Sequence, residues 1–355
     1  MKKLFILIIL LGGLGSRFKL QAQTCPNEGN VCDALELAAL NALYASSGGS
    51  AWTPINWQPG STTLARTGVT VVNGDVVAID LHHNNMIGTI PPELANLTQL
   101  QSLALYSNSA PSNRNKLEKL PDWIQPGDFP NLKTLNLSRV GLTGNKTIPP
   151  ALANLTALET LILSHNGINS SIPDAFENLL QLKRLDLYMN GVTALPAGIG
   201  KLTNLTYLDL TTNDLRGDVL PRITGLTQLQ YLSFGNNELT GKIPPGLGNL
   251  TSLQVLNLSQ NSLSGQLPGT LGNLTALTTL NLRYNAFTGP VPVSLSQLTA
   301  LTSLNLSFNR LEELPNMTFP ATLALDVSSN KLDLYDLGPY FTGVDVSEFT
   351  SPGYF

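Results

Sequence analysis

LQYLSFGNNELTGKIPPGLGNLTS (residues 229–252) is followed directly by LQVLNLSQNSLSGQLPGTLGNLTA (253–276) and LTTLNLRYNAFTGPVPVSLSQLTA (277–300). The shared pattern, L-x-x-L-x-L-x-x-N-x-L and then x-G-x-I-P-x-x-L-x-x-L, recurs from about Val76 to Leu332 at a spacing of 24 residues or close to it. Self-similarity at this period predicts a solenoid, because each unit can bury its apolar face only against its neighbours. Such folds provide long concave binding surfaces rather than deep pockets.

Each unit begins with residues that alternate between apolar and polar, as a half-buried strand requires. In residues 253–258, Leu256 and Leu258 are expected to point inward, while Asn257 faces out. Units are counted from eleven starting residues, namely Val76, Leu100, Leu132, Leu158, Leu182, Leu205, Leu229, Leu253, Leu277, Leu301 and Thr322. The sequence therefore predicts an α/β solenoid with a parallel sheet on its concave face, an irregular or 3-10 convex side and a helical N-terminal cap.

An Asn follows the strand at the point where the chain turns away from the sheet. Its amide can satisfy backbone groups that the turn leaves without partners. We interpret these residues as a structural ladder rather than as a site, and they are Asn84, Asn166, Asn190, Asn213, Asn237, Asn261, Asn285, Asn309 and Asn330. Val140 occupies the slot in the third unit, so an interruption of the ladder is expected there.

The repeat resembles the plant-type leucine-rich repeat, LxxLxLxxNxLxGxIPxxLxxLxx, of plant receptor-kinase ectodomains, polygalacturonase-inhibiting proteins and secreted bacterial proteins. The resemblance covers about 257 of 355 residues. It implies the same solenoid fold, but it says little about the ligand, because the ligands of this family are unrelated to one another.

The first residues have the composition of a secretory signal. Lys2 and Lys3 precede the apolar run 4–14, and a polar stretch ends at Gln23. We expect cleavage near residue 23 and a secreted or cell-surface protein. The apolar run is too short to span a bilayer, and no later segment reaches 18 apolar residues, so no membrane span is expected in the mature chain.

Charge and cysteine content restrict the partners. Without residues 1–23, the basic residues number 16 against 24 acidic ones, and the net charge of −8 argues against nucleic acid as the main partner. The only two cysteines, Cys25 and Cys32, favour a disulfide in an exported chain. The alternative of a metal site would need more ligands than Cys-x6-Cys and three His supply. No metal and no cofactor are predicted.

The chain divides into a signal peptide (1–23), an N-terminal cap (24–75), the repeats (76–333) and a C-terminal cap or tail (334–355). In the cap, Asp33-Ala-Leu-Glu36 has the form of a capping-box variant that opens a helix, and Gly48-Gly49 ends it. We expect Trp52 and Trp57 to be core residues. The order of helix, Trp and Gly68-Val69-Thr70 resembles the plant-type cap, although a second Cys pair usual in that cap is absent.

Motifs of catalysis are absent, so no enzyme is predicted. A ligand would contact the outward strand positions, and the candidates there are Arg139, His165, Lys183, Arg184, Tyr188, Tyr207, Tyr231, Arg283 and Tyr284. Tyr and Arg are enriched at binding hot spots. The alternative is that exposed aromatics reflect strand propensity alone.

The second unit is 32 residues long, and its extra segment, SNSAPSNR (107–114), must leave the stack at the rim. Insertions in solenoids are often part of the binding face. Candidate rim residues are Tyr106, Ser107, Asn108, Ser109, Asn113 and Arg114. The alternative is a tolerated surface insertion, because lengthening a loop costs little free energy.

We therefore interpret the chain as a non-enzymatic recognition protein that binds an extracellular protein or glycan through its concave face. One alternative is an inhibitor of secreted polysaccharide-degrading enzymes, or a carbohydrate binder. A less favoured alternative is an ice-binding protein, which would need a flat, regular row of small residues.

Overall fold

The computed structural model describes residues 31–55, 57–58, 63–108 and 114–332. The predicted signal peptide, the C-terminal segment 334–355 and the rim residues Ser109 and Asn113 lie outside this part of the chain. So does Cys25, and with it the predicted disulfide to Cys32. These expectations, and the domain boundaries at residues 23 and 333, stay predictions.

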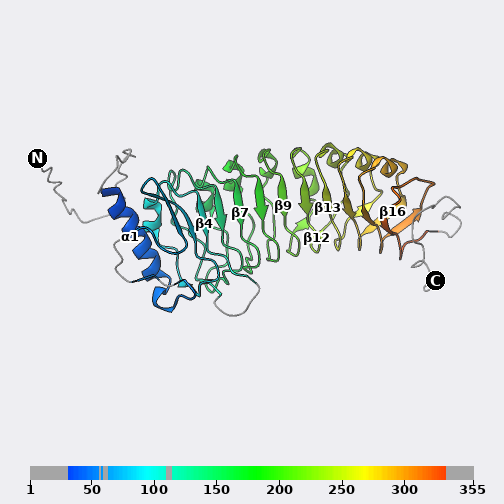
Figure 1. The fold of residues 1–355 in the computed structure, drawn as a ribbon. Helices are drawn as coiled ribbons and strands as arrows, with labels where there is room; N and C mark the ends of the chain where they lie inside the picture. The colour runs from blue at the N-terminus through cyan, green and yellow to red at the C-terminus, as the bar shows by residue number, and fades with distance from the viewer. Residues whose placement is uncertain (1–30, 56, 59–62, 109–113, 333–355) are drawn as a thin grey trace, which may run out of the picture.

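The described chain forms a gently curved stack with α1 (Val31–Ser46) at its N-terminal end (Figure 1). Its main sheet has twelve strands in the described residues, in the order β1-β2-β4-β6-β7-β8-β9-β11-β13-β15-β17-β19. The strands are β1 (Val69–Val72), β2 (Asp75–Asp80), β4 (Ser102–Ala104), β6 (Thr134–Asn136), β7 (Thr160–Ile162), β8 (Arg184–Asp186), β9 (Tyr207–Asp209), β11 (Tyr231–Ser233), β13 (Val255–Asn257), β15 (Thr279–Asn281), β17 (Ser303–Asn305) and β19 (Ala324–Asp326). The parallel order confirms the predicted α/β solenoid.

Every repeat contributes its strand in the same register. Leu208, Leu232 and Leu256 pair side by side in β9, β11 and β13, and all three are fully buried. The residues on either side of each central Leu therefore form continuous columns on the outer, concave face, because side chains alternate across a strand. This register decides which side chains meet on the candidate site.

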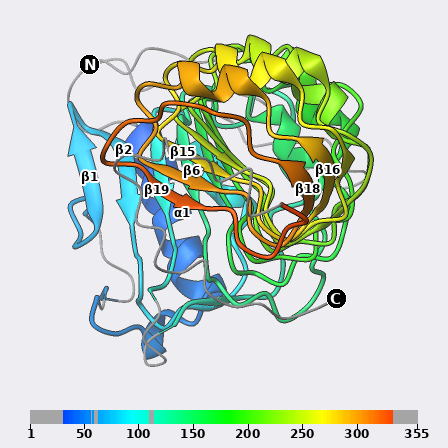
Figure 2. The same cartoon turned by 90° about the vertical axis from the view of Figure 1, so that its right-hand side faces the viewer.

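The far side of each coil is built from short strands and 3-10 turns, as predicted. Figure 2 shows β16 and β18 opposite the main sheet, with the 3-10 helices along one edge between them. The short strands are β3 (Ile87–Gly88), β5 (Lys116–Leu117), β10 (Arg216–Gly217), β12 (Glu238–Leu239), β14 (Ser264–Gly265), β16 (Ala286–Pro290) and β18 (Arg310–Glu313). The 3-10 helices are η1 (Gly49–Ala51), η2 (Pro92–Asn96), η3 (Pro150–Asn154), η4 (Asp174–Asn178), η5 (Ile199–Lys201), η6 (Leu220–Ile223), η7 (Pro245–Asn249), η8 (Gly269–Asn273) and η9 (Val293–Gln297).

The N-terminal cap differs from the sequence prediction at the start of its helix. Helix α1 begins at Val31, two residues before the Asp33 that was expected to open it. Glu36 is buried, and its Oε2 accepts a hydrogen bond of 3.1 Å from the backbone N–H of Val76. Glu36 therefore holds the start of the first repeat. The local sequence pattern had suggested a role for it in capping the helix. No helix in the described residues has the length and apolarity to cross a membrane.

Trp52 and Trp57 are core residues, as expected. The ring of Trp52 packs edge-on against Tyr44 and Trp57, with centroid distances of 5.3 and 5.0 Å. Each indole N–H is satisfied: Trp52 donates to the carbonyl of Ser47, and Trp57 donates to that of Thr67. The aromatic cluster thus fixes the cap against the first repeat.

The Asn ladder is confirmed in the repeats from Asn166 onward. In each, Nδ2 donates to a carbonyl of its own repeat and to one of the preceding repeat, while Oδ1 accepts a backbone N–H. For Asn237 the carbonyls are those of Phe234 (3.0 Å) and Leu210 (2.8 Å), and the N–H is that of Leu215 (3.0 Å). Asn84 differs: its Oδ1 accepts the N–H of Ile55, and its Nδ2 has no partner among the described residues.

Val140 changes the ladder less than the sequence suggests. The carbonyls that an Asn would cover there are already bonded, that of Leu105 to Asn115 (2.7 Å) and that of Leu137 to Asn166 (2.8 Å). The hydroxyl of Ser107 accepts the N–H of Asn115 at 2.8 Å. Because both carbonyls already accept a hydrogen bond, the buried Val140 leaves neither of them without a partner.

Candidate ligand-binding surface

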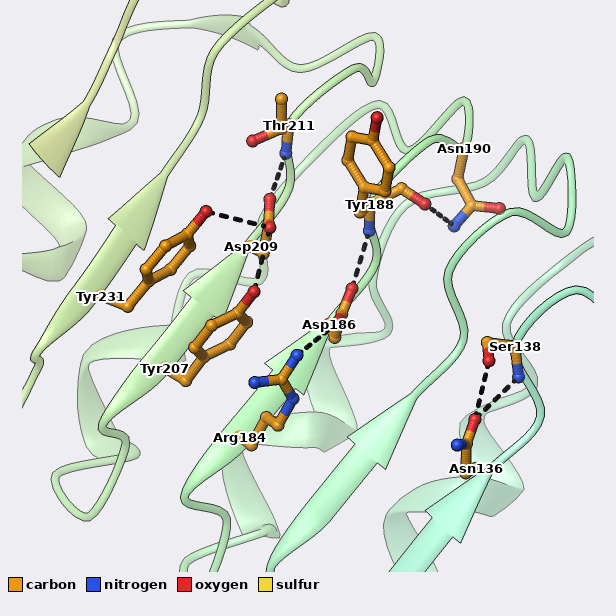
Figure 3. Close-up of polar contacts among 10 residues, drawn as sticks. All are labelled: Asn136, Ser138, Arg184, Asp186, Tyr188, Asn190, Tyr207, Asp209, Thr211 and Tyr231. Atoms are coloured by element: carbon orange, nitrogen blue, oxygen red, sulfur yellow. Dashed lines mark hydrogen bonds and ion pairs between the residues drawn. The ribbon is translucent and has the colours of Figure 1, made fainter. Parts of the chain in front are cut away.

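Five side chains from β8, β9 and β11 meet at the middle of the concave face (Figure 3). They are Arg184, Asp186, Tyr207, Asp209 and Tyr231, here called the central cluster. Arg184, Tyr207 and Tyr231 occupy the first position of three adjacent strands, and the register places them side by side. The sequence analysis had selected these three residues as ligand contacts but had not selected the two carboxylates.

The two carboxylates are held by the turns that end the strands. Asp186 accepts the backbone N–H of Tyr188 at 3.2 Å, and Asp209 accepts that of Thr211 at 2.9 Å. Asp and Asn side chains favour this bond to the backbone two residues on. The same bond recurs at Asp80, Asn136, Asn257, Asn281, Asn305 and Asp326. Eight of the eleven repeats have an Asp or Asn in this slot, the exceptions being Ala104, Ile162 and Ser233, and this recurrence was the sequence signal that could have found the column.

Each remaining carboxylate oxygen binds a side chain of the cluster. Arg184 Nη2 donates to Asp186 Oδ2 at 2.6 Å, and its guanidinium carbon lies 3.5 Å from the centroid of the Tyr207 ring. The hydroxyls of Tyr207 and Tyr231 approach Asp209 Oδ2 at 3.2 and 3.5 Å. The two rings stack at 4.3 Å with planes 8° apart. The cluster is therefore fixed before any ligand arrives.

The environment of the cluster disfavours ionisation of its phenols. Burial, followed by the negative charge of Asp209, raises the pKa of Tyr207 far above its usual range. The same two causes raise the pKa of Tyr231. Both side chains consequently stay neutral hydrogen-bond donors at physiological pH.

An open depression begins at this cluster. Its volume is about 320 Å³, and it is lined by Arg184, Thr206, Tyr207, Gln230, Tyr231, Gln254 and Val255. The first strand position becomes small beyond Tyr231, where it holds Val255, Thr279, Ser303 and Ala324 in the following strands. The Tyr231 ring thus forms a step above a floor of small side chains, and a planar group could pack against it.

Three other predicted residues lie beside the cluster, at the ends of strands rather than on them. Arg139 and His165 adopt left-handed φ angles of 55° and 59° in the turn before the ladder position. Arg139 Nη2 lies 2.5 Å from His165 Nε2, and the His165 ring packs edge-on against Tyr188 at 4.9 Å. Burial and then the charge of Arg139 lower the pKa of His165.

Lys183 is separate from the central cluster. Its Nζ lies 2.7 Å from Glu159 Oε2, and Lys133 lies 3.4 Å from the other oxygen of that carboxylate. The hydrogen bond from Lys183 is the main cause that lowers the pKa of Glu159, against an opposing effect of burial. Lys183, which was predicted to contact a ligand, is thus already paired with Glu159.

Arg283 and Tyr284 form a second aromatic cluster two repeats beyond Tyr231. The ring of Tyr284 stacks on Phe308 at 4.1 Å with planes 21° apart, and Arg283 lies 4.7 and 4.9 Å from the two ring centroids. Tyr284 and Phe308 are 40% and 36% exposed. The predicted concave residues therefore divide into separate groups, and Phe308, whose sequence position also puts it on this face, belongs to the second of them.

One rim prediction is wrong. Ser107 is only 2% exposed, and its hydroxyl is bonded to the backbone of Asn115, so it cannot contact a ligand at the rim. Tyr106 stacks on His82 at 5.0 Å with planes 11° apart. Asn108 is exposed and Arg114 is half-buried.

Within the described parts of the chain, no three His, Cys, Asp or Glu side chains are grouped as metal ligands would be.

Comparison with known families identifies the repeat. The family described as leucine-rich repeat region matches residues 168–283, and the family described as Leucine Rich Repeat matches residues 76–97 and 276–298. A search among curated proteins gave no match.

Solved structures with the same fold include plant receptor ectodomains. The Arabidopsis receptor kinase HAESA, in complex with the peptide hormone IDA and the co-receptor SERK1, is 29% identical with a TM-score of 0.64, over 85% of this chain and 54% of the receptor. The ectodomain of GASSHO1/SCHENGEN3 from Arabidopsis thaliana, in complex with CASPARIAN STRIP INTEGRITY FACTOR 2, is 24% identical with a TM-score of 0.69, over 84% of this chain and 41% of that one. The chain thus spans about half or less of the length of these receptors.

A plant ice-binding protein has a length closer to that of this chain. It is 23% identical with a TM-score of 0.66, and the alignment covers 86% of this chain and 96% of the other. At this identity the likeness shows the fold alone.

Proposed function

Because this chain is a leucine-rich repeat protein, we propose that it is a non-enzymatic recognition protein that binds an extracellular protein or glycan along its concave face. The observation that carries the proposal is the central cluster, in which two carboxylates fix one Arg and two Tyr in a single arrangement. Side chains that are already ordered lose little conformational entropy on binding, so a ligand gains affinity from each contact.

The composition of the cluster supports recognition over catalysis. Arg and Tyr are the residues that most often carry the binding energy of an interface. Asp186 is bonded to Arg184, and Asp209 accepts both Tyr hydroxyls. Neither carboxylate is therefore poised as a general base, which needs a free oxygen within reach of the proton it removes.

The comparisons add support for a ligand-binding role. The HAESA structure contains a peptide hormone, and the GASSHO1/SCHENGEN3 structure contains CASPARIAN STRIP INTEGRITY FACTOR 2. We also propose that the chain is exported, because residues 1–23 have the composition of a secretory signal. N-terminal sequencing of the protein recovered from culture medium tests the export step, and an intact Met1 would contradict it.

The test of the concave face uses Tyr231→Ala. The wild-type chain is first screened against a glycan array and a library of secreted peptides, and the probe that binds is titrated against both proteins. We expect Tyr231→Ala to weaken binding of that probe at least tenfold, as loss of a buried aromatic contact does. The control is Val293→Ala, which removes an exposed apolar side chain from η9 on the far side. Equal affinity of wild type and Tyr231→Ala would refute the proposed location.

A carbohydrate ligand is favoured by one observation. The depression combines aromatic rings with hydrogen-bonding groups, because the amides of Gln230 and Gln254 and the hydroxyl of Thr206 line it together with the rings of Tyr207 and Tyr231. An inhibitor of polysaccharide-degrading enzymes would use the same surface to contact the enzyme, and a pull-down with secreted hydrolases distinguishes it. Ice binding is disfavoured by the bulky, charged residues of the cluster, and an ice-recrystallisation assay tests it.

A further inference from the structure

Two cationic side chains lie near the central cluster, at the strand ends of the second and third repeats. They are Arg114 and Arg139, here called the cationic group, and the neutral His165 of the fourth repeat lies beside Arg139. Arg114 comes directly before Asn115, which is fixed by three hydrogen bonds to the first repeat and one to the carbonyl of Leu105 in its own repeat. Arg139 and His165 take the same place in successive turns, so the parallel register sets them side by side.

The cationic group lacks acidic partners of its own. In the described residues, no carboxylate forms an ion pair with Arg114 or Arg139. The acidic side chain that acts on His165 is Asp186, and it is already bonded to Arg184. Nε of Arg114 is buried and has no hydrogen-bond partner. In a chain with a net charge of −4, two guanidinium groups without an ion pair among the described residues thus lie close enough together to act on the same His165.

His165 orients Arg139 rather than neutralising it. The guanidinium donates to Nε2 at 2.5 Å, so the imidazole that accepts this bond is neutral, and its ring is held in turn by Tyr188. The other N–H groups of Arg139 are left to bind oxygen atoms. A guanidinium offers them in a planar fork that matches carboxylate and sulfate groups.

We propose that the cationic group binds an oxyanion, either the carboxylate of a uronic acid or a sulfate ester, carried by a polysaccharide that lies along the concave face. The proposal rests on the function proposed above. From Arg139 to Tyr231 the surface crosses four strand spacings, about 19 Å at ~4.8 Å each. An extended chain is needed to occupy both ends, and the aromatic rings and amides that line the depression beside Tyr231 suit the apolar faces and the hydroxyls of sugar rings.

The test compares three oligosaccharides of equal length: an oligogalacturonate, a sulfated dextran and unmodified dextran. Binding of each to the full chain is measured by calorimetry. We expect one of the acidic oligosaccharides to bind at least tenfold more tightly than dextran, with an affinity that falls as salt is added, because salt screens exposed charges. Whichever acidic oligosaccharide binds identifies the group as carboxylate or sulfate.

The double variant Arg114→Gln and Arg139→Gln removes the charge while keeping long polar side chains. It should lose at least tenfold in affinity for the acidic oligosaccharide, whereas Arg216→Gln, which removes an exposed Arg paired with Glu238 on the far side, should lose nothing. Circular dichroism of the variants confirms that they are folded.

Three results would overturn the proposal: no binding of either acidic oligosaccharide, unchanged affinity of the double variant, or tighter binding of poly-glutamate than of both. A probe whose affinity depends on Tyr231 but not on Arg114 and Arg139 would leave the proposed function standing while this inference fails.

Discussion

Replacing Asn213 with Ala tests whether the Asn ladder stabilises the stack. The side chain is 7% exposed, and it donates to the carbonyls of Leu187 and Leu210, both at 3.0 Å. It also accepts the N–H of Val192 at 2.8 Å. Alanine leaves the buried N–H of Val192 without an acceptor, whereas the carbonyls of Leu187 and Leu210 keep the bonds donated by Asn190 (3.0 Å) and Asn237 (2.8 Å). Leaving one buried donor unsatisfied costs about 1–3 kcal/mol, so the free energy of unfolding should fall by about 2–3 kcal/mol once the two lost side-chain bonds are included.

Urea unfolding followed by circular dichroism measures this loss, and hydrogen exchange locates it. The amide of Val192 should lose its protection, because its acceptor is gone. Gln230→Ala is the matched control, since it removes an exposed amide from the neighbouring repeat and should change stability by less than about 0.5 kcal/mol. A loss below about 1 kcal/mol with Val192 still protected would refute the reasoning, because the N–H of Val192 would then have found another acceptor.

Three further predictions concern single groups. Ser107→Ala removes the acceptor of the Asn115 N–H and should lower the free energy of unfolding by about 1–2 kcal/mol in urea; an unchanged midpoint would contradict the role given to this hydroxyl. Burial, with Arg139 contributing, lowers the pKa of His165, so the unfolded chain takes up this proton first as the pH falls; the stability that depends on the neutral ring is present above about pH 6.5 and is lost as the pH falls through the lower pKa of the folded state. His165→Gln should flatten this acid decline in a series of thermal melts, and an identical slope would exclude the linkage. Burial and the charge of Asp209 raise the pKa of Tyr207, so Asp209→Asn should lower it in an alkaline titration followed by phenolate absorbance; no change would show that the carboxylate is not a cause.

The regular positions of the repeat predict the fold because each has one physical task. A Leu at the centre of a strand is buried whatever its neighbours are, as Leu208 and Leu232 show. An Asn at the turn meets the same backbone groups in every repeat. Such local rules repeat along the chain, so the sequence alone sufficed for the solenoid and the ladder.

The contacts of the candidate site could be predicted only in part. Tyr207 and Tyr231 were found because they stand at equivalent strand positions. The role of Asp209 depends on two hydroxyls from different repeats reaching one oxygen, which the register permits but does not reveal. Arg139 was predicted as an outward strand residue and His165 as a strand-end residue, and the structure places both in a left-handed turn at the strand ends.

Two side chains bind a segment that the local sequence did not indicate. Glu36 fits a helix-capping pattern, and Ser107 begins an insertion, so local sequence pointed to the helix end for the first and to a rim loop for the second. Both are buried, and each bonds to backbone outside its local sequence pattern, Glu36 to Val76 and Ser107 to Asn115. A buried backbone group that lacks a partner in its own repeat recruits whichever polar side chain is near, and sequence does not show that need.

Strand β1 makes the two ends of the stack unequal as surfaces for self-association. It runs antiparallel to β2 and has an irregular register between Thr70 and Val71, so the first parallel strand is not left as a free edge. Short, irregular edge strands resist pairing with another chain. A head-to-tail filament needs both ends of every subunit to be open. Closing the N-terminal end is therefore enough to keep a long parallel sheet from polymerising.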